Sequence, residues 1–172
     1  WTRRQRQMCI RDRSKIDSYH KLRDFPAEDG GSHLSVYLRF GNISIRELVR
    51  FCLKENSEGI SVWLNELIWR EFYMMILFQF PHVVGNSFLP KYQHIVWPGS
   101  DENFELWKVG ETGFPIVDAA MRDFKNTGWM HNRLRMIVAS FLVKDLLVDW
   151  RYGEKYFAEN LLDFELASNN GG

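Results

Sequence analysis

Residues 112–147 read TGFPIVDAAMRDFKNTGWMHNRLRMIVASFLVKDLL, and this stretch decides the fold class. Pro115 stands at the first position of a predicted helix, where a missing N–H does no harm, and Gly128 stands where that helix would end. The apolar residues between them recur at helical spacing: Val117, Met121 and Phe124. A second, longer helix is predicted over about 131–147. The stretch therefore predicts two consecutive helices.

Helical patterns continue on both sides of this stretch. Residues 44–47 (SIRE) form a capping-box pattern, and 60–80 predict a long helix that Pro81 limits. A shorter helix is predicted over about 154–162. The predicted apolar face of the long helix consists of Trp63, Leu64, Leu67, Ile68, Phe72 and Met75. Residues 81–112 are predicted to be irregular, and no segment shows convincing strand alternation, so we expect an all-α fold.

The composition is that of a globular protein. Hydrophobic residues make up 45% of the 172 residues and charged residues 26%, which excludes wholesale disorder. The longest apolar run, 137–143, is far shorter than the about 18 residues that a membrane span needs. Two cysteines, Cys9 and Cys52, cannot form a disulfide framework or a metal-ligand pattern. We therefore expect a cytoplasmic protein with no membrane partner and no metal.

The first 13 residues, WTRRQRQMCIRDR, differ from the rest in charge. They carry five Arg and one Asp, so their net charge is +4 and that of residues 14–172 is −4, since the whole chain is neutral. They show neither helical nor strand period. We predict a foreign head at 1–13 and one domain over 14–172. Any binding of nucleic acid would then depend on a local basic patch.

Two segments of the N-terminal half combine glycine, polar and charged residues in ways that suit a ligand. Residues 30–35 (GGSHLS) precede a short apolar helical run at 34–40, and their N–H groups and hydroxyls suit a phosphate, although Ser32 capping the helix is the simpler alternative. Glu66 and Arg70 fall on one helical face with Trp63. They would either pair with each other or bind a polar ligand.

Two further segments lie in the C-terminal half. Asn132, Arg135 and Met136 share one turn of the predicted helix, and Arg133 points elsewhere. Arginines at a helix start oppose the helix dipole, so they favour a ligand, with a solvated basic face as the alternative. The carboxylates of Asp163 and Glu165 would accept hydrogen bonds from ribose hydroxyls or an arginine, or be solvated.

Taken together, residues 19–172 resemble the FAD-binding helical domain of the photolyase/cryptochrome family, and most of all class I cyclobutane pyrimidine dimer photolyases. The signature runs are ELIWREFY (Glu66–Tyr73), the opening stretch, DWRYGE (Asp149–Glu154) and the terminal DFELASNNGG. The resemblance implies an all-α domain around a U-shaped FAD that is active in its reduced form, FADH⁻. It also implies that the N-terminal α/β antenna domain, with any antenna chromophore, and the C-terminal remainder are missing.

Matching positions imply roles for individual residues. The implied FAD-binding residues are Tyr19, Gly31, Ser32, His33, Leu34, Ser35, Trp63, Glu66, Arg70, Trp129, Asn132, Arg135, Asp163, Glu165 and Asn169. The implied DNA-binding residues are Arg23, Glu66, Trp69, Asn132, Arg133 and Met136. Glu66 would also stabilise the dimer during the reaction, and Asn169 would lie opposite flavin N5. Trp97 and Trp150 match the distal and middle members of a tryptophan chain that photoreduces the flavin.

The implied activity is a carbon–carbon lyase reaction, in which light drives an electron from reduced FAD to split cyclobutane pyrimidine dimers in DNA. The expected partner is dimer-containing DNA, and the expected state is a monomer. Gly31 stands where the family usually has Thr, and Glu165 where it has Asp, so FAD affinity is expected to be lower at an unchanged site. The alternatives are a photoreceptor without repair activity, against which Trp69, Met136 and Asn169 argue, and an inactive fragment.

Overall fold

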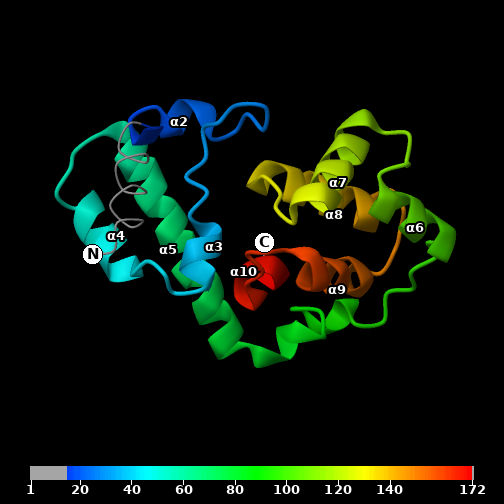
Figure 1. Cartoon of the computed structure of the whole chain (residues 1–172). Coiled ribbons are helices and arrows are strands. Elements are labelled where there is room, and N and C mark those ends of the chain that lie inside the picture. Colours follow the sequence, from blue (N-terminus) through cyan, green and yellow to red (C-terminus); the bar gives the residue numbers. More distant parts are fainter. Residues whose placement is uncertain (1–14, 172) are drawn as a thin grey trace. The chain divides into compact units, whose positions relative to one another are not determined.

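The computed structural model describes residues 15–171, and these residues form helices and no strand (Figure 1). The all-α prediction is confirmed. The predicted head and Cys9 lie outside the described residues. None of the described helices is both long enough and apolar enough to cross a membrane. The described residues form two compact units that divide between Phe72 and Tyr73, called unit 1 and unit 2 below.

Unit 1 contains short helices around a small core. Its elements are α2 (Tyr19–Leu22), α3 (Ser35–Arg39), α4 (Ile45–Cys52) and most of α5 (Glu58–Gln79). Its core consists of Ile16, Leu34, Leu48, Cys52, Ile60, Trp63 and Leu67. Helix α4 begins directly after Ser44, as predicted, but the Ser44 side chain accepts no hydrogen bond from the helix, so the capping box predicted there does not form.

Helix α5 begins two residues before its predicted start and ends one residue before its predicted end. Its predicted apolar face is only partly correct. Trp63 and Leu67, one turn apart, are buried in the core of unit 1, whereas Ile68 and Met75 are 57% and 49% exposed. The helix carries apolar residues around most of its circumference, and only the stripe that faces the core is covered.

Unit 2 contains helices that pack each against the next along the chain. Its elements after the end of α5 are the 3₁₀ turns η1 (Pro81–Val84) and η2 (Pro90–Tyr92), then α6 (Asp101–Val109), α7 (Pro115–Thr127), α8 (Asn132–Lys144), α9 (Trp150–Asn160) and α10 (Leu166–Gly171). Helix α6 packs on α7, α7 on α8, α8 on α9, and α9 on α10, which also contacts η1. The core formed by α6 to α9 includes Trp107, Met121, Phe124, Val138 and Leu142.

The prediction that residues 81–112 are irregular is wrong for α6. Ser100 caps this helix by accepting a hydrogen bond from the Asn103 N–H at 3.1 Å, and Gly110 ends it at φ 70°. Trp107 of α6 is fully buried, and its indole N–H donates to the carbonyl of Val138 at 3.0 Å. The segment therefore contributes the largest side chain of the unit 2 core.

The predicted boundaries of the other unit 2 helices need small corrections. Helix α7 begins at Pro115 and ends before Gly128, which has a φ of 66°, as predicted. Helix α8 ends at Lys144, three residues before its predicted end. Helix α9 begins at Trp150 rather than near residue 154, because the Asp149 carboxylate accepts a hydrogen bond from the Arg151 N–H and caps the helix there.

Candidate functional site

In unit 1, a carboxylate, a guanidinium and a phenol come together between α2 and α5. The Nη1 of Arg23 donates to Oε1 of Glu66 at 2.5 Å, and the Arg23 guanidinium lies 5.6 Å from the centre of the Tyr19 ring. Burial, and next the charge of Glu66, raise the pKa of Tyr19 to about 12. The Tyr19 hydroxyl carries its proton at neutral pH, as an ordinary phenol does, and the raised pKa extends this to more alkaline pH.

The structure of unit 1 changes how three predicted residues are understood. Glu66 pairs with Arg23, which lies 43 residues away in the sequence, whereas the sequence suggested a partner on its own helix face. Arg23, assigned to a DNA phosphate, has one Nη on that carboxylate. Trp63, assigned to the FAD cavity, is only 5% exposed within the core of unit 1. The ligand contacts of all three stay predictions.

The glycine-rich segment before α3 follows an ion pair between Lys15 and Asp29. Nε2 of His33 lies 3.4 Å from Oδ1 of the same carboxylate, and the backbone of His33 has a φ of 52°. The N-cap of α3 is Leu34, so the alternative in which Ser32 caps the helix is wrong. Ser32 Oγ instead accepts a long hydrogen bond of 3.4 Å from the Leu34 N–H.

The surroundings of Gly31 show whether the threonine that the family usually has at this position would fit. A Cβ added at Gly31 would meet a single atom within 4 Å, Nε2 of His33 at 3.9 Å. Packing therefore does not require glycine at this position. At the preceding Gly30, by contrast, a Cβ would lie 2.4 Å from Cβ of Leu22, so glycine there is needed for close packing against α2.

In unit 2, Arg135 and Asp163 form a buried ion pair. The Nη2 of Arg135 donates to Oδ1 and Oδ2 of Asp163 at 2.9 and 2.8 Å, and its Nε donates to the carbonyl of Met130 at 2.8 Å. The Asp163 side chain is 2% exposed and that of Arg135 is 26% exposed. The hydrogen bonds to Asp163 and Met130 use Nη2 and Nε of Arg135. Its Nη1 therefore remains as a donor close to the buried carboxylate of Asp163.

Glu165 and Asn169 lie at α10, with their polar atoms bonded within unit 2. The Glu165 carboxylate accepts hydrogen bonds from the N–H groups of Ala167 and Ser168 at 3.1 and 3.0 Å, and from the Ser168 hydroxyl at 2.9 Å. It thus caps α10, a role the sequence analysis did not predict. Asn169 Nδ2 donates to Oε1 of Glu154 at 3.4 Å. Their predicted flavin contacts stay predictions.

The start of α8 carries further predicted residues. Asn132 is the first residue of the helix, and Met136, one turn further along, is 54% exposed. The helix is capped by His131, whose Nδ1 accepts a hydrogen bond from the Arg133 N–H at 3.1 Å, and the sequence analysis missed this cap. Trp129, just before it, is half-buried. Asn132 and Met136 are thus both exposed on one face of α8, and their predicted ligand contacts stay predictions.

The two tryptophans assigned to electron transfer are half-buried, and neighbouring residues tie their segments together. The Gly99 N–H donates to the carbonyl of Leu147 at 3.0 Å, and a Cβ at Gly99 would lie 2.5 Å from the Leu146 carbonyl oxygen. Gly99 follows Trp97 by two residues, and Leu147 precedes Trp150 by three. The chain segments that carry both rings are thus in direct contact.

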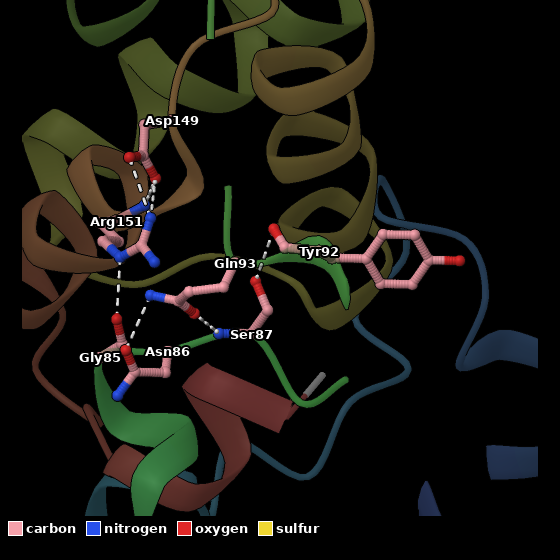
Figure 2. A network of polar contacts seen from close by, with 7 residues as sticks. All are labelled: Gly85, Asn86, Ser87, Tyr92, Gln93, Asp149 and Arg151. Atoms are coloured by element: carbon pink, nitrogen blue, oxygen red, sulfur yellow. Dashed lines mark hydrogen bonds and ion pairs between the residues drawn. The ribbon is translucent and has the colours of Figure 1, made fainter. Parts of the chain in front are cut away.

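A polar network surrounds the start of α9 (Figure 2). Arg151 donates from Nη1 to both oxygens of Asp149 at 3.1 and 3.0 Å, and from Nε to the carbonyl of Gly85 at 2.9 Å. Beside it, Nε2 of Gln93 donates a hydrogen bond to Oδ1 of Asn86, and Oε1 of Gln93 accepts one from the Ser87 N–H. Neither Asp149 nor Arg151 was predicted to have a role, although an aspartate just before a helix start is a capping signal.

Comparison with known proteins identifies the family of this chain. The sequence model of the family described as the FAD binding domain of DNA photolyase matches residues 63–172. The chain belongs to this family. The deoxyribodipyrimidine photo-lyase of Vibrio cholerae is 51% identical over 93% of this chain, and that of Escherichia coli is 47% identical over 97%. The chain spans 35% and 36% of their lengths.

Solved structures agree with this assignment. A bacterial class III photolyase from Agrobacterium tumefaciens matches with a TM-score of 0.88 and 39% identity, over 96% of this chain and 35% of its own. A cryptochrome from Synechocystis matches with a TM-score of 0.84 and 32% identity, over 92% of this chain and 34% of its own. The prediction of a photolyase/cryptochrome helical domain is therefore confirmed.

Proposed function

We propose that this chain is part of a deoxyribodipyrimidine photo-lyase that binds FAD and repairs cyclobutane pyrimidine dimers in DNA. The observation that carries the proposal is 51% identity, over 93% of the chain, to a protein of that name. We further propose that the FAD-binding domain runs over 14–172, with 1–13 outside it, and that the protein is a cytoplasmic monomer. When bound, reduced FAD supplies the electron that light sends to the dimer.

The donors that the chain offers suit FAD. In unit 1, the protonated Tyr19 hydroxyl and the hydroxyls of Ser32 and Ser35 are donors for a diphosphate. In unit 2, Arg135 keeps donors beside the buried Asp163 carboxylate, a combination that suits the polar edge of a planar ring or a ribose. The amide of Asn169 donates and accepts hydrogen bonds, as a group facing a ring nitrogen must.

The roles of Glu66 and Arg23 toward the dimer follow from their pairing. A carboxylate bonded to a guanidinium is a hydrogen-bond acceptor, so Glu66 would hold an N–H of the pyrimidine edge. Its negative charge does not itself favour an added electron, and the positive charge of Arg23 would compensate for it. Trp69, 53% exposed on α5, would offer an apolar face to a flipped dimer.

The test uses the protein expressed from its complete gene. We expect it to purify with FAD, visible in its absorption spectrum, and to remove dimers from an oligonucleotide only in the light. Glu66→Gln should lower repair yield severalfold and weaken FAD binding less than that, whereas Glu71→Gln, which changes an exposed carboxylate on the same helix, should match the native protein.

Three outcomes would overturn parts of this proposal. Bound FAD without repair would remove the lyase activity and favour a photoreceptor, in keeping with the structural likeness to a cryptochrome. A folded protein without FAD would remove the cofactor. Equal repair by Glu66→Gln and Glu71→Gln would remove the role given to Glu66.

A further inference from the structure

One guanidinium in unit 2 is fixed over an indole ring. The Cζ of Arg151 lies 4.9 Å from the centre of the Trp150 ring. Three acceptors hold it there: the carbonyl of Gly85 and both carboxylate oxygens of Asp149 (Figure 2). The side chains of Arg151 and Asp149 are 35% and 21% exposed, so solvent screens their charges only in part.

A cation held over a ring changes the energy of removing an electron from that ring. The guanidinium attracts the neutral indole through the negative face of the π-system. Once the indole has lost an electron it is itself a cation, and the attraction becomes repulsion. Arg151 therefore makes Trp150 harder to oxidise. The negative charge of Asp149 acts in the opposite direction, since it favours a cation on the ring.

We propose that the Asp149–Arg151 pair sets how readily Trp150 gives up an electron, so that these two residues are positioning and tuning residues for one-electron transfer through Trp150. The proposal rests on the proposed function and on the role that the family resemblance implies for Trp150, the middle member of a tryptophan chain that photoreduces the flavin. In that chain one electron leaves the Trp150 indole for the photo-excited flavin side, and Trp97 then returns one electron to Trp150. The pair therefore acts on both steps, because a Trp150 that is harder to oxidise gives up its electron less readily and, once oxidised, takes the electron of Trp97 more readily.

The test needs neither FAD nor DNA. Flash-excited tris(bipyridyl)ruthenium(II) gives one electron to an added sacrificial cobalt(III) complex, which is reduced to cobalt(II), and thereby becomes ruthenium(III). Ruthenium(III) then takes one electron from an indole and returns to ruthenium(II), and the indole radical cation releases its Nε1 proton to water. The rate measured for each protein minus the rate for its Trp150→Phe counterpart gives the share of Trp150. High salt screens the attraction between the complex and the protein charges.

Removing the charge of Arg151 and removing that of Asp149 should change the oxidation rate of Trp150 in opposite directions. A purely structural role of the pair would not give opposite changes. Arg151→Gln should speed the oxidation of Trp150 by about two- to fivefold, and Asp149→Asn should slow it by a similar factor. Asparagine still caps a helix, so Asp149→Asn should keep α9. Arg151→Lys keeps the charge and should stay near the native rate. Circular dichroism should show unchanged helicity in each variant.

A second ion pair on α9 supplies the matched controls. Lys155 lies 3.9 Å from Glu159, further along the same helix, and both side chains are mostly exposed. Lys155→Gln and Glu159→Gln remove the same charges and should leave the Trp150 rate unchanged. Shifts in the same direction for Arg151→Gln and Asp149→Asn, shifts as large in the controls, or no share of Trp150 in the native rate would each overturn the proposal.

The result is separable from the proposed function. A protein that fails to bind FAD or to repair DNA can still show the opposite shifts in this assay, because ruthenium replaces the flavin as oxidant. Conversely, repair with no shift at Arg151 and Asp149 would support the lyase activity and remove only the tuning role.

Discussion

The carboxylate of Asp163 is almost completely buried and takes its balancing charge from Arg135, whose Nη2 bonds both of its oxygens. In Asp163→Asn the amide cannot accept both charge-assisted bonds, and the guanidinium loses its counter-charge. We expect the free energy of unfolding to fall by about 2–3 kcal/mol, measured by urea titration. Asp123→Asn, an exposed carboxylate on α7, is the control and should change it little. Equal losses in the two variants would contradict the importance of the ion pair.

The ion pairs also show where prediction from single residues ends. Helical spacing identifies partners three or four residues apart, and so it suggested Arg70 for Glu66. The structure pairs Glu66 with Arg23, which directly follows α2, and joins Arg135 to a carboxylate 28 residues away. An arginine was among the predicted partners of Asp163. Which arginine it would be depends on packing, which no local pattern encodes.

At the scale of elements, the start of α7 depends on Asp118, a buried carboxylate inside the helix. Its oxygens accept hydrogen bonds from the Thr112 N–H at 2.8 Å, the Thr112 hydroxyl at 2.6 Å and the Gly113 N–H at 3.0 Å. Burial alone would raise the pKa of Asp118, but these hydrogen bonds outweigh burial and hold the pKa below its usual value. The ionised carboxylate thus ties the loop to the helix.

This lowered pKa predicts a pH dependence of stability. A carboxyl group with a folded-state pKa below its unfolded value of about 3.9 contributes stability above that pH, and the contribution is lost as the pH falls through the folded pKa. Urea midpoints from pH 6 to pH 2 should therefore fall more steeply for the native chain than for Asp118→Asn. At pH 6 the variant should be less stable by about 1–3 kcal/mol. Parallel curves for the two proteins would contradict the assignment.

Elements were predicted well where a helix has strong signals at both ends and less well elsewhere. Pro115 and Gly128 enclose α7, and both boundaries are correct. Helix α6 has signals of the same kind, with Ser100 before it and Gly110 after it. Its nine residues were nevertheless predicted to be irregular, because prolines and glycines are frequent in the surrounding sequence. The start of α9 could have been read from Asp149 as a capping residue. Caps therefore locate short helices better than apolar periodicity does.

At the scale of the whole molecule, two separate cores explain why burial was hard to predict. Exposed apolar side chains are numerous, and Phe78 and Val96 are each 83% exposed. A sequence shows which side chains are apolar, but it does not show which of them another element will cover. The helix type of α5 was therefore predictable, whereas the exposure of Ile68 and Met75 on it was not.

The division into two units predicts separable stability. Leu48 of α4 is buried in the core of unit 1, and Leu142 of α8 in that of unit 2, and each change to alanine should cost about 2–5 kcal/mol. Because contacts within a unit transmit the loss, Leu142→Ala should reduce hydrogen-exchange protection of α7 and α8 and spare α4. Leu48→Ala should do the reverse. Helix α5 belongs to both units, so its two ends should respond to different variants. Uniform loss of protection along the chain in either variant would mean that the two cores unfold as one.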